Sequence, residues 1–191
     1  MRELPASNFV LLVKGVRHVD HAKVPGDIRE AELIRLMETY GNALTGLCTA
    51  LTRDADLAQD AVQEAFLRAY RNLDRYRGGR AQERAWLTRI AVNICRDMRR
   101  SKWFRWVDRS VSLDSLPEPA APVQQEDWQL YDAVQSLPDK LRETVVLRYH
   151  QDMDTEEIAR ILGTTRTTVY RRLDRAYQLL KQRLEEADHD D

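Results

Sequence analysis

The chain has 191 residues, of which 43% are apolar and 32% charged, enough for one domain or two small ones. With 7% aromatics, seven glycines and six prolines, this composition excludes a large multidomain catalyst, a glycine-rich β-sandwich and a low-complexity chain. No stretch approaches the ~18 apolar residues of a membrane span. The early apolar run at 8–13 leads into Lys14 rather than a small-residue cleavage site. We therefore expect a soluble, helix-rich protein of the cytoplasm.

The net charge of −1 conceals two basic blocks. Residues 68–109 hold thirteen basic and four acidic side chains, and residues 166–183 hold six basic and one acidic. The balancing acids lie in 54–64, 114–127 and 185–191. Two separate basic surfaces are typical of a protein that grips nucleic acid, although solvated arginine-rich helix faces would give the same count.

Apolar residues recur every three or four positions over 28–51, over 57–73 and from about Arg84 to Met98, which predicts three amphipathic helices. Residues 1–27, ending in Pro25-Gly26-Asp27, are expected to form a poorly ordered leader. The proline-rich stretch at 116–122 predicts a linker, after which a second helical block begins near Asp127. Cys48 and Cys95 lie inside apolar helical patterns and are expected to be buried thiols.

Residues 155–169 have the spacing of a helix-turn-helix, with Ala159 at the helix crossing and Gly163 at the turn. Gly163 is expected to adopt a left-handed conformation that ends the first helix. Thr155, with Glu156 or Glu157, is the expected cap of that helix, and Thr165 the cap of the next. An ordinary αα-hairpin is the alternative. The exposed arginines favour DNA, with six candidates for the major groove: Arg166, Thr168, Tyr170, Arg171, Arg172 and Arg175.

Arginines and tryptophans alternate over 86–106, a mixture that suits unpaired bases and their phosphates. The alternative is that Trp86 belongs to the core and that residues 103–106 anchor the linker. Asn93, Arg96 and Arg100 are spaced to share one helix face, where the amide could pair with an extruded base and the arginines could hold the backbone.

Taken together, these motifs resemble the extracytoplasmic-function group of bacterial sigma factors, which carry only sigma regions two and four. Residues 60–70 are similar to the helix that docks on the polymerase β′ subunit, 86–100 to the segment that opens the minus-ten element, and 137–148 with the helix-turn-helix to the region that reads the minus-thirty-five element. The loop expected before Trp86, residues 80–84, departs from the family pattern.

The resemblance implies an all-α fold with two small helical domains: leader 1–27, region two over 28–106, linker 107–126, region four over 127–184 and acidic tail 185–191. The implied partners are the β and β′ subunits of core polymerase, promoter DNA and an anti-sigma factor. The implied polymerase-binding strip is expected to be exposed on the second helix, its leucine included, and comprises Asp60, Gln63, Glu64 and Leu67.

Two other classes of protein compete with this interpretation. A stand-alone helix-turn-helix regulator would explain the C-terminal half but leave residues 60–100 without a role. An enzyme is disfavoured because the four histidines are scattered and no glycine-rich phosphate loop is present. We expect no catalytic residue, no metal site and no cofactor.

Overall fold

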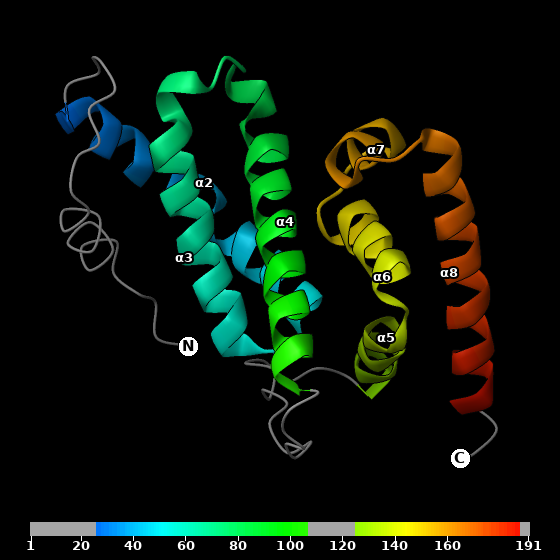
Figure 1. Ribbon diagram of the computed structural model, residues 1–191. Coiled ribbons are helices and arrows are strands. Elements are labelled where there is room, and N and C mark those ends of the chain that lie inside the picture. The colour runs from blue at the N-terminus through cyan, green and yellow to red at the C-terminus, as the bar shows by residue number, and fades with distance from the viewer. Residues whose placement is uncertain (1–25, 107–124, 188–191) are drawn as a thin grey trace.

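The computed structural model describes residues 26–106 and 125–187, and every regular element in those ranges is a helix (Figure 1). The all-α prediction is confirmed. The N-terminal body contains α2 (Gly26–Thr52), α3 (Ala55–Asn72), a 3₁₀ turn (Leu73–Arg75) and α4 (Arg80–Trp106). The C-terminal body contains α5 (Gln125–Ser136), α6 (Asp139–Val145), a π-helical turn (Val146–His150), α7 (Thr155–Leu162) and α8 (Arg166–Ala187).

Helix α3 packs closely against α2 and α4 because its inward face is built from small side chains. Ala58, Ala61, Ala65 and Ala69 recur at intervals of three and four and are buried, with Phe66 the one large buried side chain beside them. Asp54 caps α3 by accepting a hydrogen bond from the backbone N–H of Leu57 at 3.0 Å. The N-terminal body is therefore a tight three-helix bundle.

Both cysteines lie in this bundle and are buried, as expected. Cys48 comes from α2 and Cys95 from α4. The hydrogen bond to Cys95 and burial together raise the pKa of the Cys48 thiol. Cys48 is therefore a packing residue that stays protonated.

The two bodies share one apolar core. Buried side chains of α2, such as Leu47, belong to the same cluster as Leu147 of the π turn and Met153 before α7. Helix α2 contacts α6 and the π turn, and α4 contacts α7. In this structure the bodies therefore lie side by side, with α4 and α6 facing each other across the junction (Figure 1).

Several helix boundaries differ from the sequence prediction. Gly26 already belongs to α2, and Gln125 begins α5. Helix α4 begins at Arg80, so residues 80–84 form its first turn instead of a loop. The remaining parts of the predicted leader, linker and tail, namely 1–25, 107–124 and 188–191, lie outside the described residues.

Candidate nucleic-acid interface

A basic pocket with an aromatic wall lies where α3 ends and α4 begins. The Tyr76 and Trp86 rings stack with centroids 4.4 Å apart and planes 22° from parallel. The cavity has a volume of about 480 Å³, and Asn93 of α4 lies on its lining. We call it the Trp86 pocket, lined by Arg68, Asn72, Arg75, Tyr76, Arg77, Trp86, Ile90 and Asn93.

Contacts from α2 fix the start of α4 and thereby the pocket. Glu83, which is buried, accepts hydrogen bonds from Arg35 at 2.7 Å and from the Tyr40 hydroxyl at 3.2 Å. Hydrogen bonds to Glu32 and Glu83 raise the pKa of the Arg35 guanidinium. Glu83 precedes Trp86 by three residues, so this contact orients the helix turn that carries the indole.

The structure separates the three residues predicted to contact the minus-ten element. Asn93 is exposed at the Trp86 pocket, and Arg100 is exposed further along α4. Arg96 is instead ion-paired with Glu143 of α6 at 2.7 Å, and this hydrogen-bonded carboxylate raises the pKa of the guanidinium. The expectation that Arg96 is free on an open helix face is therefore wrong for this arrangement of the two bodies.

The helix-turn-helix is formed by α7 and α8. Gly163 ends α7 with φ +64° and ψ +44°, the left-handed conformation expected of it. Ile158 and Val169 are fully buried between the helices, and Ala159 is nearly so. Thr165 accepts a hydrogen bond from the backbone N–H of Thr168 at 3.2 Å, which confirms it as a helix cap.

The cap of α7 differs from the expectation of Thr155. Asp154 is the capping residue, accepting hydrogen bonds from the backbone N–H groups of Glu156 and Glu157, each at 2.8 Å. Glu157 completes a capping box by accepting from the Asp154 N–H. The backbone donors lower the pKa of the Asp154 carboxyl. The Thr155 hydroxyl instead donates to the Tyr170 hydroxyl at 3.4 Å.

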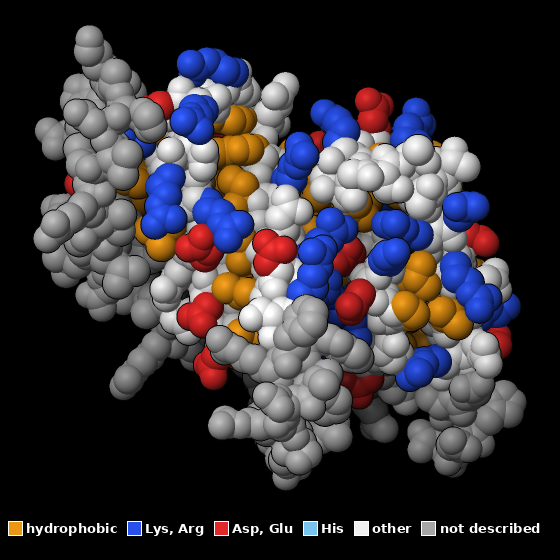
Figure 2. Space-filling model, in the orientation of Figure 1, with side chains coloured by type: hydrophobic (Ala, Val, Ile, Leu, Met, Phe, Trp, Pro, Cys, Tyr) orange, Lys and Arg blue, Asp and Glu red, His pale blue; other side chains and the backbone are white. Residues whose placement is uncertain are grey.

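The outer face of α8 carries the side chains predicted to read DNA. Arg166, Tyr170, Arg171 and Arg175 are exposed, whereas Thr168 and Arg172 are half-buried. Hydrogen bonds to Thr155 and Arg166 lower the pKa of the Tyr170 phenol. Figure 2 shows Lys and Arg side chains over α3 and α4 and again over the C-terminal body, on one face of the molecule.

The strip predicted to bind polymerase is only partly exposed. Asp60 is exposed, whereas Gln63 and Glu64 are half-buried. Leu67 is also half-buried and packs against the core, so the expectation of an exposed leucine is wrong. Glu64 forms an ion pair with Arg68 at 2.7 Å, which links the strip to the lining of the Trp86 pocket.

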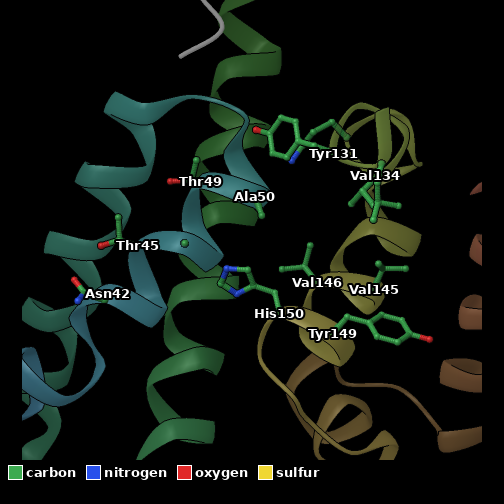
Figure 3. A pocket seen from close by; sticks show the side chains of 13 residues that line it. Asn42, Thr45, Thr49, Ala50, Tyr131, Val134, Val145, Val146, Tyr149 and His150 are labelled. Carbon is green, nitrogen blue, oxygen red and sulfur yellow. The ribbon is translucent and has the colours of Figure 1, made fainter. Parts of the chain in front are cut away.

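A largely apolar groove of about 620 Å³ runs between the two bodies (Figure 3). Sequence reasoning did not find it, because its walls come from segments far apart in the chain. Helix α2 supplies one wall, including Thr45 and Gly46, and α5 and the π turn supply Val134, Val146 and Tyr149. The His150 ring points at α2, where only a glycine at position 46 leaves it room: a Cβ there would lie 2.7 Å from the ring.

Comparison with known families accounts for both bodies. A family model described as Sigma-70 region 2 matches residues 36–105, and one described as Sigma-70, region 4 matches residues 127–180. The stand-alone regulator interpretation is disfavoured, because it leaves the first of these matches unexplained. Within the described residues, no helix is both long enough and apolar enough to cross a membrane.

Individual relatives agree. The chain is 30% identical over 180 residues to RNA polymerase sigma-H factor of Pseudomonas aeruginosa, covering 85% of this chain and 92% of that protein. It is 33% identical over 162 residues to the ECF RNA polymerase sigma factor SigL of Mycobacterium tuberculosis, covering 82% and 92%.

Solved structures support the fold. The sigma factor RpoE of Bartonella quintana, in complex with the anti-sigma factor NepR, matches with a TM-score of 0.68 and 23% identity over 81% of this chain and 97% of that chain. CnrH, in complex with the cytosolic domain of CnrY, matches with a TM-score of 0.62 and 22% identity over 95% and 97%. Two matching family regions and full-length relatives lead to one conclusion: the chain belongs to the sigma-70 family as an extracytoplasmic-function sigma factor, an initiation factor that directs promoter-specific transcription.

Proposed function

We propose that the Trp86 pocket captures an unpaired base of the minus-ten element and thereby promotes DNA melting. The supporting observation is the combination of a stacked Tyr76–Trp86 wall with the exposed amide of Asn93 at the same cavity. An aromatic wall stacks on any base, whereas an amide both donates and accepts hydrogen bonds and so can discriminate a base edge. Arg75, an exposed arginine of the lining, would neutralise a flanking phosphate.

The minus-thirty-five element is assigned to α8. Residues near the start of a recognition helix reach base edges, whereas those one or two turns later meet the phosphate walls. Arg166 and Thr168 are therefore the proposed base readers, with Tyr170 or Arg171 beside them. Arg172 and Arg175 are the proposed phosphate contacts. The exposure of Arg166 and Arg175 at different turns of the same helix supports this division.

The proposed partner subunits are those that the family resemblance implies. We assign the strip around Asp60, Gln63, Glu64 and Leu67 to the β′ subunit of core polymerase and expect the C-terminal body to meet the β subunit. The exposed Asp60 and the Glu64–Arg68 ion pair give the strip a polar surface beside the half-buried Leu67, which supports a docking role.

An anti-sigma factor is the proposed regulator, and the cytoplasm, where promoter DNA is found, the proposed compartment. A sigma factor of similar fold, RpoE of Bartonella quintana, has been solved in complex with the anti-sigma factor NepR. A protein that fills the interdomain groove would contact α2 and the π turn together. It would therefore oppose any step that separates the two bodies.

The experiment compares Asn93→Ala with wild type in transcription by core polymerase from two templates, one duplex and one with a pre-melted minus-ten bubble. If the pocket offsets the cost of unstacking a base, transcription by the variant falls about tenfold on duplex DNA, equivalent to roughly 1.4 kcal/mol. Most of the lost transcription returns on the pre-melted template. Arg89→Ala, at an exposed position of the same helix that is not part of the pocket lining, is the control. Equal loss on both templates would contradict the assignment.

A further inference from the structure

The junction between the bodies is closed by a buried carboxylate. Glu143 of α6 has only 2% of its side chain exposed and accepts hydrogen bonds from two arginines of α4. Arg96 donates from Nη2 to Oε2 at 2.7 Å and from Nε to Oε1 at 3.1 Å, and Arg99 donates from Nη2 to Oε1 at 2.6 Å. Both carboxylate oxygens are therefore satisfied by the N-terminal body.

The neighbouring contacts tie the same helices together. Arg142, almost fully buried, donates to the Leu51 carbonyl of α2 at 3.4 Å and to Asp139 at 2.7 Å. Burial lowers the pKa of the Arg142 guanidinium, because a charged group is less stable away from water. Arg142 is the third arginine at this junction. Gln151 adds a hydrogen bond to the Ala43 carbonyl at 3.0 Å. Glu143 is thus the negative centre of an arginine-rich interface.

An arginine fork recognises carboxylate and phosphate oxygens by the same planar, bidentate geometry. Glu143 therefore occupies Arg96 and Arg99 in the way that a DNA phosphate would. The side chains of these arginines are only 23% and 18% exposed, so a phosphate cannot reach them while α6 is in place.

Promoter binding requires this contact to break. The two promoter elements lie some 25 base pairs apart, about 85 Å of duplex at 3.4 Å per pair. A compact chain of this length is only ~40–50 Å across. The bodies must therefore separate for the Trp86 pocket and α8 to reach both elements.

We propose that Glu143 is an internal competitor of promoter DNA: its carboxylate holds the C-terminal body on the arginines of α4 and keeps the free sigma factor closed until nucleic acid or polymerase displaces it. This proposal rests on the assignment of the α4 face to DNA. It explains why a helix with an exposed Asn93 and Arg100 keeps the two arginines between them covered.

The test uses the full chain without polymerase, carrying a dye pair on cysteines introduced at the exposed positions Ala31 of α2 and Gln178 of α8. The native thiols are buried and react slowly. Distance between the dyes and affinity for a labelled single strand of minus-ten sequence are measured for wild type, Glu143→Gln and the control Glu156→Gln. Glu156 carries the same charge and is exposed on α7.

We expect Glu143→Gln to lengthen the dye distance and to tighten DNA binding at least about tenfold at low salt. Removing the carboxylate leaves the arginine charges buried without a counter-charge, which strongly destabilises the closed arrangement. Glu156→Gln is expected to change either quantity less than about twofold, as for a surface charge. Adding Arg96→Gln to Glu143→Gln should remove most of the gain in affinity. If Glu143→Gln behaved like Glu156→Gln, or opened the chain without tightening DNA binding, the proposal would be overturned.

A second measurement does not depend on a variant that must fold. Saturating single-stranded DNA should lengthen the dye distance in the wild-type chain, and an unchanged distance at saturation would also overturn the proposal. Failure of the DNA assignment itself gives a different result: Asn93→Ala, which lies outside the ion-pair cluster, would then leave transcription from duplex promoters unchanged.

Discussion

Helices α4 and α8 both carry arginines, but their surroundings differ. On α4, Arg96 and Arg99 are held by Glu143 of the other body. On α8, Arg166, Arg171 and Arg175 extend into solvent. The closed chain therefore presents α8, the helix proposed for the minus-thirty-five element, while covering part of α4, the helix proposed for the minus-ten element.

This contrast shows that the number of charged residues in a segment does not tell how many of them are exposed and able to bind DNA. The basic block at 68–109 has a higher net charge than the block at 166–183. Its central arginines are nevertheless less accessible, because a carboxylate more than forty residues away meets them in the fold. The predictions below change the helix-turn-helix, the exposed arginines of α8, the outer face of α3 and the contact of α2 with the π turn.

The largest expected effect comes from Gly163→Val, which acts on the C-terminal body alone. The φ of +64° is unfavourable for a β-branched residue, although no atom within 4 Å would meet the new Cβ. Strain should lower the free energy of unfolding by about 2 kcal/mol and abolish recognition of the upstream element. Gly163→Asn is the control, since asparagine tolerates this conformation; denaturant titration should show less than half the loss. Equal losses would mean that backbone conformation is not the cause.

Substitutions at the exposed arginines of α8 should have two different effects on DNA recognition. Arg166→Ala should cost about 1–3 kcal/mol on the preferred upstream sequence and relax the preference at one position. Arg175→Ala should weaken all sequences alike and flatten the salt dependence. An upstream-element library transcribed at two salt concentrations separates these results. The same change in preference for both variants would refute the assignment of base and phosphate contacts.

On α3, Asp60→Ala should weaken binding to core polymerase about tenfold while leaving helicity unchanged, because it removes an exposed carboxylate of the proposed strip. Glu64→Ala is a less selective test, since it also releases Arg68 at the Trp86 pocket. Gln59→Ala, exposed on the adjoining face of the helix, is the matched control. Co-purification with core gives the measurement, and undiminished binding by Asp60→Ala would count against the strip.

The smallest effects compare two glycines of α2. Gly41→Ala, with nothing within 4 Å of the new Cβ, should raise the free energy of unfolding by about 0.5–1 kcal/mol through helix propensity. Gly46→Ala should gain less, because the His150 ring must move out of a 2.7 Å contact. Thermal unfolding measures both. In a His150→Ala background, adding Gly46→Ala should give the same gain in the free energy of unfolding as Gly41→Ala gives in the wild type. A smaller gain in that background would mean that the contact with His150 is not the cause.

Local patterns predicted most of the fold. The period of three and four located the described helices, and the small residues Ala159 and Gly163 located the helix-turn-helix. The cap at Asp154 was missed because two adjacent residues both have capping side chains, and sequence spacing does not decide which one turns toward the backbone. The start of α4 was placed too late for a related reason: its first turn is held by the long-range contact between Glu83 and Arg35.

The candidate site was less accessible to sequence reasoning. Asn93 could be selected from its helical face, but the Tyr76–Trp86 stack needs a loop to fold back on a helix. Glu143 resembles an ordinary helix surface residue until α6 is placed on α4, so its pairing with Arg96 depends wholly on tertiary structure. The sequence shows that each of these residues is polar, but it does not show which residue each one contacts in the fold.

The contact of Glu83 with Arg35 and Tyr40 lets residues outside the Trp86 pocket set the position of its aromatic wall. The indole of Trp86 lies one turn beyond a carboxylate that is held from α2, a helix that does not line the pocket. A substitution at Arg35 is therefore expected to shift the aromatic wall without altering any residue that lines the pocket. The list of lining residues alone thus does not fix the geometry of the pocket, because a half-buried arginine of another helix supports it.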